Sequence, residues 1–425
     1  MYTNSSRLMN RLIKQKFSKD IKSWIAYDAG NSAFATTVLA AFFPLFFSSY
    51  WAGSVDEITA TKYYTAGLTI INLFILLGMP IIGAITDVKN LTKTLFTIFT
   101  FIGASFVTSF YFIEQNSWLI ALILYGIALF CFSAAVVLYD KMLVYIAKPT
   151  ELSKVSGYGY AIGYLGGGTL FVINAFMVMN PSFFGLENNV SAIKWSFVSV
   201  GIWWIIFSLP LIVNYKQSKT RELKLSKSFN QILNTFKQIS SQKNILIFLI
   251  AFFLYIDGVH TVMFLAAMFA DGIGIGQESI ITALIIVQFV AAPLTFMWSI
   301  IANRYGDKKV IYSTIGIYIG VVIYSMSLST AIEFYILAIM VGSVQGGVQA
   351  ASRSLFAKII PIEKSGEFFG YYNTFGRAGS VIGPLLVNVF LVAFNDLRIA
   401  LVPLIILFIL GLLFLYFVEE KYENI

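Results

Sequence analysis

Charged side chains lie within stretches of this sequence that are otherwise apolar, and they are the residues with the most evident chemistry. Asp257 lies near the middle of one stretch, and Arg377 lies near the middle of another. A charge inside a bilayer is costly unless it faces a cavity or a partner, so such residues mark functional sites. A guanidinium binds carboxylates and a carboxylate binds ammonium groups, so the two residues suit a zwitterion. They also suit a static ion pair with each other, and both interpretations stay open.

Amide and imidazole side chains accompany these charges at helical spacing. In several predicted helices the polar residues recur at intervals of three, four or seven, which puts them on one face of each helix. A water-filled central cavity explains such stripes, although a single amide can also serve helix packing alone. The candidate substrate-binding residues are Asn31, Asp257, His260, Gln345, Gln349, Asn373 and Arg377.

Three carboxyl groups within the apolar stretches, Asp28, Asp140 and Asp257, are candidate proton carriers. Burial disfavours the charged form of a carboxyl group, so a proton can bind and leave within reach of physiological pH. His260, the only histidine, lies one helical turn from Asp257 and can relay a proton. A neutral histidine bonded to a neighbour fits the sequence equally well.

Other charged residues are candidates for a gate. Asp87, near the end of an apolar stretch, can cap the N-terminus of a helix in the other half of the chain or pair with a nearby basic residue. Arg304 and Arg353 are the basic gating candidates in the second half. Glycines concentrated within 157–168 and 370–383 predict close helix contacts. We therefore expect the second, fifth, eighth and eleventh predicted helices to form the seam between the halves.

Twelve apolar stretches must position these residues, and each can cross a hydrocarbon core of about 30 Å as a helix. The composition agrees, because 58% hydrophobic residues in a chain of 425 is too apolar for a soluble protein. The sequence therefore predicts an all-α membrane protein with twelve transmembrane helices. The predicted spans are 24–50, 62–86, 93–113, 118–139, 154–180, 195–215, 244–270, 279–303, 309–328, 333–357, 367–394 and 397–418.

Positive charge alternates along the chain and predicts its orientation. Of the 29 Lys and Arg residues, only Lys62, Lys194 and Arg398 lie in or beside the odd-numbered gaps between the predicted spans. Loops on the cytoplasmic side collect Lys and Arg, so both termini are predicted to be cytoplasmic. The same rule explains the net charge of +8 without nucleic acid as a partner. Compact loops and short tails favour a multi-pass protein of the bacterial inner membrane.

The longest polar gap divides the spans six and six. The predicted parts are a cytoplasmic tail (1–23), an N-terminal six-helix bundle (24–215), a linker (216–243), a C-terminal six-helix bundle (244–418) and a short tail (419–425). Apolar residues at helical spacing within the linker predict an amphipathic helix on the inner membrane face. The halves resemble each other weakly, and such a parallel repeat is typical of transporters with a site between the halves at mid-membrane.

Enzymatic and metal chemistry finds little support in the sequence. One cysteine, Cys131, and one histidine leave few soft metal ligands and no disulfide framework. No phosphate-binding loop and no supported Ser-His-Asp order are present. We therefore expect no enzyme activity, no cofactor and no metal, and a monomer in the bilayer whose partners are a small-molecule substrate, lipid and the candidate coupling proton.

Five longer stretches of the chain carry recognisable patterns: Tyr27–Phe47, Ser156–Gly168, Phe253–Thr261, Val344–Pro361 and Glu367–Pro384. Together they resemble the major facilitator superfamily. Within it, the chain is similar to the group called the unknown major facilitator family, akin to fungal vacuolar amino-acid effluxers linked to autophagy. The resemblance implies the major facilitator fold, in which two six-helix bundles rock to give alternating access, and it suggests amino-acid efflux. The family usually has Gly and Asp where this chain has Ser299 and Asn303.

The leading hypothesis is a secondary active transporter of a small organic solute, with amino acids as the candidate class and proton coupling as the candidate mechanism. One alternative is an exporter of amphipathic drugs or lipids, since Phe and Tyr are abundant. An alternative of another class is a non-transporting receptor or assembly factor. Charges at mid-membrane favour transport, because an inert scaffold has little reason to bear their cost.

Overall fold

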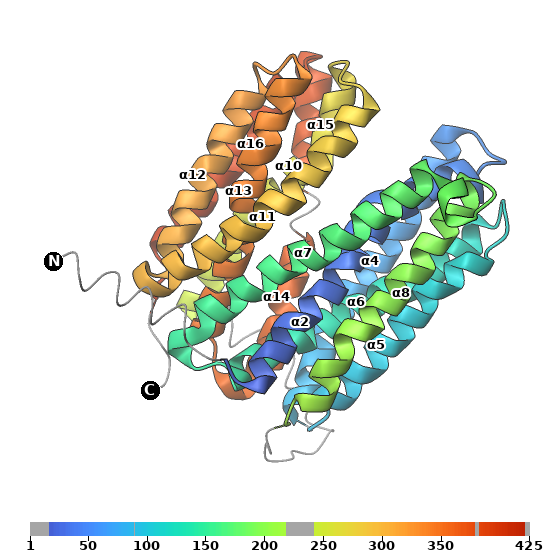
Figure 1. The fold of residues 1–425 in the computed structure, drawn as a ribbon. Helices are drawn as coiled ribbons and strands as arrows, with labels where there is room; N and C mark the ends of the chain where they lie inside the picture. The colour runs from blue at the N-terminus through green and yellow to red at the C-terminus, as the bar shows by residue number, and fades with distance from the viewer. Residues whose placement is uncertain (1–16, 89, 218–241, 379–381, 421–425) are drawn as a thin grey trace.

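The computed structural model describes residues 17–88, 90–217, 242–378 and 382–420, and these residues form helices joined by short connections (Figure 1). The amphipathic helix predicted for the linker falls almost wholly outside the described residues, as does most of the N-terminal tail. Eleven helical stretches of the described part are long and apolar enough to cross a membrane. The helix α12 (Asp307–Ser325) is not among them, because its first turn carries Asp307, Lys308 and Lys309.

The N-terminal bundle contains the first six predicted spans. Its first span begins as α2 and continues through two π-helical segments, η1 and η2, that flank the short helix α3. The bounds are α2 (Lys19–Ala33), η1 (Phe34–Phe42), α3 (Phe43–Phe46), η2 (Phe47–Trp51), α4 (Glu57–Val88), α5 (Thr92–Ser109), α6 (Trp118–Ile146), α7 (Leu152–Met179) and α8 (Asn189–Asn214).

The C-terminal bundle contains the remaining spans. The eleventh predicted span, 367–394, is described as two helices, and residues 379–381 between them are outside the described part. The bounds are α10 (Lys243–Gly272), α11 (Gln277–Tyr305), α12, α13 (Ala331–Ile359), α14 (Ser365–Ala378), α15 (Ile382–Phe394) and α16 (Val402–Tyr416).

Local signals explain several helix starts. Ser18 caps α2 by accepting a hydrogen bond from the amide of Ile21. Thr330 and Glu333 form a reciprocal capping box at the start of α13. Between these starts the apolar runs leave many large side chains exposed on the outer faces of both bundles, such as Leu73 and Val392. Such surfaces suit lipid and not water.

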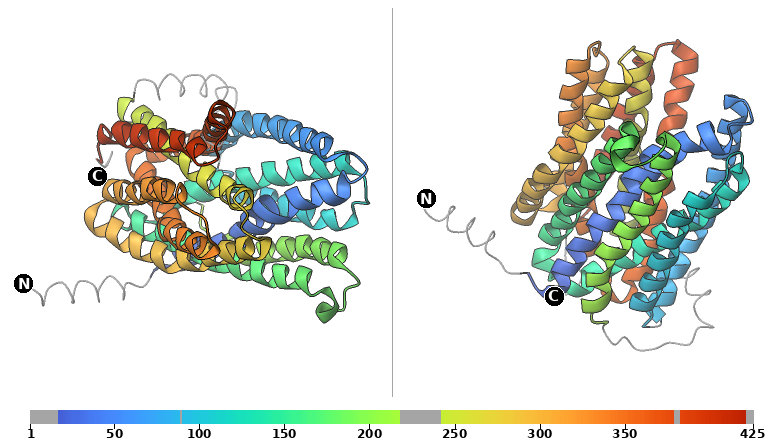
Figure 2. Two further views of the ribbon diagram at one scale, coloured as in Figure 1. Left: turned by 90° about the horizontal axis from the view of Figure 1, so that it is seen from above. Right: turned by 45° about the vertical axis from the view of Figure 1, so that its right-hand side comes forward.

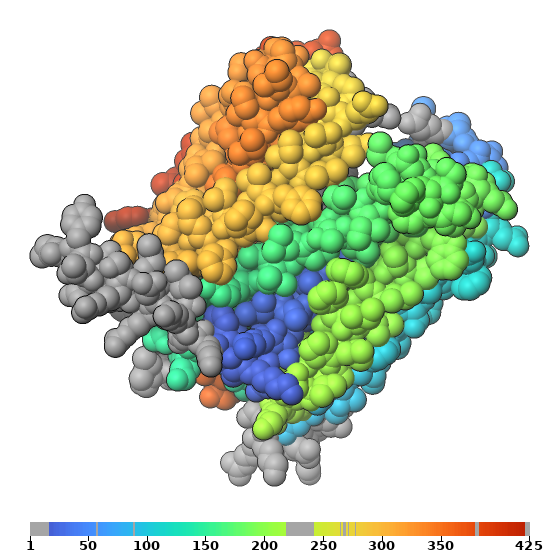
Figure 3. Space-filling view, in the orientation of Figure 1, coloured from blue at the N-terminus to red at the C-terminus, as the bar shows by residue number. Residues whose placement is uncertain are grey.

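Two pairs of helices form most of the seam between the bundles, and their four members are the helices expected there, although the sequence did not predict how they pair. The helix α7 packs against α11, and α4 packs against α14. A Cβ on Gly83 would overlap the backbone of Gly366, and a Cβ on Gly157 would overlap Ser299. Figure 3 shows α7 and α11 in contact along the front of the molecule, and Figure 2 shows the bundles from two other sides.

Candidate functional site

A buried arginine of the C-terminal bundle is inserted among polar groups of the N-terminal bundle. Arg353 of α13 donates from Nε to Oγ of Ser156 (2.9 Å) and from Nη2 to the Ser156 carbonyl (2.8 Å), both on α7. The guanidinium also lies over the rings of Trp24, Tyr139 and Tyr160, at 4.8, 5.3 and 4.2 Å from their centres. Hydrogen bonds in its plane and aromatic faces above it suit a guanidinium, which is weakly hydrated.

Two of the predicted proton carriers are the acidic partners of this arginine. Nη1 of Arg353 lies 3.3 Å from Oδ1 of Asp140 on α6, and Nη2 lies 3.8 Å from Oδ2 of Asp28 on α2. Tyr139 donates its hydroxyl to Asp28 (3.1 Å), and Asn373 of α14 donates its amide to Asp140 (3.2 Å). One arginine and one amide of the C-terminal bundle are thus bound by carboxylates of the N-terminal bundle.

Asp87 makes both kinds of contact that its position in the sequence suggests. Its carboxylate accepts hydrogen bonds from the amides of Gly366 (3.0 Å) and Glu367 (2.7 Å), in the first turn of α14 in the other bundle. Its Oδ1 also lies 2.7 Å from Nζ of Lys141, on α6 of its own bundle. Amides at the start of a helix lack partners within the helix, so a carboxylate there satisfies them.

A second cluster closes the same end of the molecule beside α7 and α13. Nζ of Lys358 lies 2.7 Å from Oδ2 of Asp307 and 3.5 Å from Oε1 of Glu420. The same ammonium donates to Oγ of Ser153 in the N-terminal bundle (2.9 Å). Tyr145 adds a hydrogen bond to the carbonyl of Ile362 across the seam (3.0 Å).

All of these contacts lie at one end of the molecule, the end where α2 begins and α16 ends. Further from that end, two more contacts join the bundles. Thr374 donates a hydrogen bond to the carbonyl of Leu76, and Gly168 lies beside Gln288. In Figure 3 the opposite ends of the bundles stand apart. The molecule is therefore closed between the bundles at the end where α2 begins and α16 ends.

Asp257 and Arg377 do not form an ion pair in the described structure. Asp257 is fully buried, and its Oδ2 accepts a hydrogen bond from the amide of Gly383 (2.7 Å), in the first turn of α15. Among the described residues, Oδ1 of Asp257 has no hydrogen-bond partner. The sequence left a static pair with Arg377 open, and helix capping occupies the carboxylate instead.

Arg377 is half-buried and lies between the bundles. It lies near Tyr125 of α6 in the N-terminal bundle and near His260 of α10. His260 is itself within reach of the backbone of Gly376. No hydrogen bond or ion pair of the Arg377 guanidinium is present among the described residues. A half-buried guanidinium in this position can receive a carboxylate from a solute.

The remaining substrate-binding candidates lie on several different helices. Asn31 is buried and accepts a hydrogen bond from Tyr27 within its own helix, so it belongs to the N-terminal bundle core. Gln345 is buried and lies near Tyr164 of α7, and its Oε1 has no hydrogen-bond partner in the described part. Gln349 is half-buried one turn further along α13. Asn373 contacts Asp140, as described above.

The structure does not bring Arg304 to the seam. This residue is exposed at the end of α11, where its guanidinium lies 5.1 Å from the centre of the Tyr305 ring. In this structure it takes no part in the contacts between the bundles described above. Lys358 contacts the other bundle at this end, through Oγ of Ser153.

Sequence reasoning missed Lys141, Lys358 and Asp307, which are all buried at the closed end. Lysines there were read as solvated residues that fix orientation. A signal was present for two of them, because Lys141 directly follows Asp140, and Asp307 lies in the gap between the eighth and ninth predicted spans, beside two lysines. Ser156 was noted only as part of a matching stretch, and its two bonds to Arg353 could not be read from the sequence.

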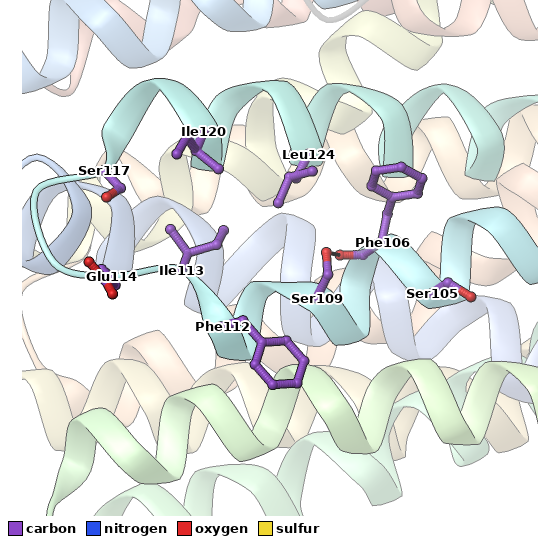
Figure 4. Close-up of a pocket in the computed structure, with 9 residues that line it drawn as sticks. All are labelled: Ser105, Phe106, Ser109, Phe112, Ile113, Glu114, Ser117, Ile120 and Leu124. Atoms are coloured by element: carbon purple, nitrogen blue, oxygen red, sulfur yellow. Dashed lines mark hydrogen bonds between the residues drawn. The ribbon is translucent and has the colours of Figure 1, made fainter.

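Two cavities lie away from the seam. One is lined by residues of α5, α6 and their connection, among them Ser109, Glu114 and Leu124, on the outer side of the N-terminal bundle (Figure 4). The other lies at the closed end, beside the starts of α2 and α5. No group of three or more His, Cys, Asp or Glu side chains in the described part is placed to hold a metal ion.

Comparison with known proteins identifies the family. The model of a family described as "Vacuole effluxer Atg22 like" matches residues 49–422. The chain is 35% identical over 412 residues to an uncharacterized MFS-type transporter, YxiO, of Bacillus subtilis (strain 168), and the match covers 96% of each chain. It is 25% identical over 293 residues to autophagy-related protein 22 of Yarrowia lipolytica (strain CLIB 122 / E 150), which is 60% of this chain and 49% of the fungal protein.

The fold agrees with this family. A structure of the MFS proton:xylose symporter XylE bound to 6-bromo-6-deoxy-D-glucose superposes with a TM-score of 0.73 at 13% identity, covering 95% of this chain and 97% of XylE. The resemblance seen in the sequence is confirmed, and so is the major facilitator fold of two helical bundles. Family and fold are those of transporters, not of enzymes, and the protein is a multi-pass integral membrane protein. The chain belongs to the Atg22-like family of major facilitator superfamily transporters.

Proposed function

We propose that this protein is a secondary transporter of a small zwitterionic solute, with amino acids as the candidate class, and that it works by alternating access. The observation that carries the proposal is Arg377, a half-buried guanidinium between the bundles with no ionic partner among the described residues. An unpaired charge at mid-membrane is costly, so its retention favours a ligand that supplies the partner. The family description, which names vacuole effluxers, supports transport of this kind and favours efflux.

The closed end supplies the second part of the proposal, which is the gate. Asp87 caps a helix of the other bundle, and Arg353 is bound by Asp28 and Asp140 across the seam. Opening this end requires these contacts to break together. Separation leaves Arg353 without its carboxylates and the first-turn amides of α14 without their acceptor, unless water or a proton replaces the partner. We assign Asp87 and Arg353 to the gate, with Lys358 in place of Arg304.

A proton is the coupling ion that we propose, and the carboxyl groups already described are its candidate carriers. Protonation of Asp28 or Asp140 removes the negative partner of Arg353 and weakens the closed end. Asp257 is fully buried with one oxygen unpartnered, and its neutral form avoids an unmatched charge there. Protonation of a seam carboxyl group would thus favour opening at the closed end.

Transport by purified protein in proteoliposomes tests the proposal. We expect exchange of a labelled amino acid across the vesicle membrane, and net accumulation that responds to an imposed pH gradient. Arg377→Ala should abolish both, because the solute carboxylate loses its partner. Arg304→Ala changes the same residue type at an exposed position away from the seam and should leave both unchanged. Equal activity of the two variants would refute the role of Arg377.

A second set of variants distinguishes proton coupling from solute binding. Asp257→Asn and Asp140→Asn keep the size of the side chain but cannot carry a proton. We expect the variant that removes the coupling carboxyl group to retain exchange and to lose the response to the pH gradient. A gradient response that survives in both of these variants and in Asp28→Asn would eliminate the proposed proton carriers. No transport of any zwitterion, with transport of amphipathic cations instead, would overturn the substrate class.

A further inference from the structure

A cavity of about 710 Å³ lies at the closed end of the N-terminal bundle, on the side away from the seam. Its lining includes Lys19 at the start of α2, Lys93 in the first turn of α5 and Lys216 just after α8. Asp20 is the one acidic residue in the lining. The transport proposal uses none of these residues. Three elements thus converge on a cavity where positive charge exceeds negative charge.

A hydrogen-bonded frame holds one of these lysines in place. Nζ of Lys93 donates to the carbonyl of Tyr215 (3.2 Å), and its amide donates to Oε1 of Gln217 (3.0 Å). Asn214 donates to Oγ of Ser23 (2.8 Å), which ties α8 to α2 at the same level. Tyr215 is buried beneath the cavity. Fixed contacts therefore hold Lys93 in the cavity, whereas Lys19 and Lys216 are exposed at its rim.

The electrostatics of the cavity favour an anion. No ion pair of Lys19, Lys93 or Lys216 is present in the part of the chain that the structure describes. Asp20 offsets one of the three ammonium charges and leaves an excess of positive charge. Both α2 and α5 begin at the cavity, and the amide ends of helices add to the positive potential there. A phosphate would satisfy these groups.

An apolar path leads away from the cavity along one face of α8. Val213, which lines the cavity, is 71% exposed, and Leu209, Ile206 and Ile202 follow at intervals of three and four residues with exposures of 44%, 53% and 52%. Residues at this spacing share one face of a helix. Because α8 spans the membrane, this face is in contact with acyl chains. A ligand that matches both the positive cavity and the apolar face of α8 has a phosphate joined to hydrocarbon chains.

We propose that this cavity binds the headgroup phosphate of an anionic phospholipid, whose acyl chains lie along the exposed face of α8. The lipid would contact α2, α5 and α8 at the end of the N-terminal bundle that meets the C-terminal bundle. The proposal commits to a lipid because of the apolar path, since a free phosphate would gain nothing from the exposed residues of α8. It is independent of the solute and of the coupling ion.

Native mass spectrometry of the purified full-length protein tests this proposal with phosphatidylglycerol as the probe. The test variant is Lys19→Gln/Lys93→Gln/Lys216→Gln. The matched control is Lys148→Gln/Lys243→Gln/Lys309→Gln, which removes three exposed lysines elsewhere on the protein. We expect phosphatidylglycerol binding to weaken roughly tenfold or more in the test variant only. Zwitterionic phosphatidylcholine should bind both variants and the unchanged protein alike.

Several outcomes would overturn the proposal. An equal loss in test and control variants would show general charge attraction in place of a site. Displacement of phosphatidylglycerol by millimolar inorganic phosphate would show that the site recognises phosphate without the lipid. Lys93→Arg keeps the charge and should retain binding, so that variant guards against loss through misfolding. Loss of binding in Lys93→Arg with unchanged thermal stability would also contradict the proposal, because a phosphate accepts either cation.

Discussion

At the scale of single residues, Arg353 is the best-connected charge in the described structure. It contacts Ser156, Asp140 and Asp28 in its plane and three aromatic rings on its faces. A buried charge is tolerated only with such a complete set of partners, and removal of one partner is far more costly than replacement of the whole set. The two carboxylates depend on the arginine as much as the arginine depends on them.

This dependence gives a stability prediction. Arg353→Met should destabilise the protein by about 3–5 kcal/mol, because it leaves two buried carboxylates without their cation. Thermal unfolding in detergent measures the effect, and Arg304→Met at the exposed position serves as the control. The double variant Arg353→Met/Asp140→Asn should recover part of the loss. Equal unfolding temperatures for the two single variants would contradict this account.

Individual contacts also show which features of the site the sequence could not predict. The sequence left helix capping and a basic partner open for Asp87, and the structure shows both contacts. The pairing of Arg353 with Asp140 joins residues 213 positions apart, and no local pattern encodes it. Lys141 and Lys358 were counted as loop lysines, since sequence position alone cannot distinguish a buried ammonium from a solvated one.

At the scale of elements, the spans themselves were predictable and their ends were less so. Apolar length fixes a span, and α6 extends to Ile146, seven residues beyond the predicted end at 139, because Asp140 and Lys141 are buried by partners. The four helices expected at the seam do lie there, but their pairing, α4 with α14 and α7 with α11, was not predicted from the sequence. The π-helical segments η1 and η2 in the first span have no sequence signal that we recognise.

The close contact between α4 and α14 predicts the effect of a larger side chain at the seam. Gly83→Ala should weaken the closed end, because the added Cβ would overlap the backbone of Gly366 on α14. We expect a lower unfolding temperature and reduced transport. Gly316→Ala on α12 is the matched control, since nothing lies within 4 Å of the added carbon there, and alanine improves helix propensity. If Gly83→Ala behaves like Gly316→Ala, the seam at α4 and α14 is not a tight contact.

At the scale of the whole molecule, the two bundles meet at one end and stand apart at the other (Figures 1 and 3). The major facilitator fold was predictable from twelve spans, alternating positive charge and the matching stretches. The conformation was not, because both ends of such a molecule must form contacts at different stages of a transport cycle and the sequence encodes both. Only the packed structure shows which set of contacts is made.

Distance measurements between spin labels test the proposed rocking. In a Cys131→Ala background, one pair at Ser54 and Ser327 spans the separated end, and another at Lys148 and Lys309 spans the closed end. Binding of the transported solute or a change of pH should shorten the first distance and lengthen the second, each on the order of 5 Å. Two distances that change in the same direction, or not at all, would exclude alternating access by rocking.

The position of Arg353 has a further consequence for the speed of the cycle. One side chain serves acceptors on α2, α6 and α7 at once, so the bundles cannot separate at this end by small independent steps. Intermediate separations would lose every bond of the guanidinium while water is still excluded, and they should be sparsely populated. Opening then behaves as a single activated event, and turnover should show a steep temperature dependence that flattens once Arg353 is shortened to lysine.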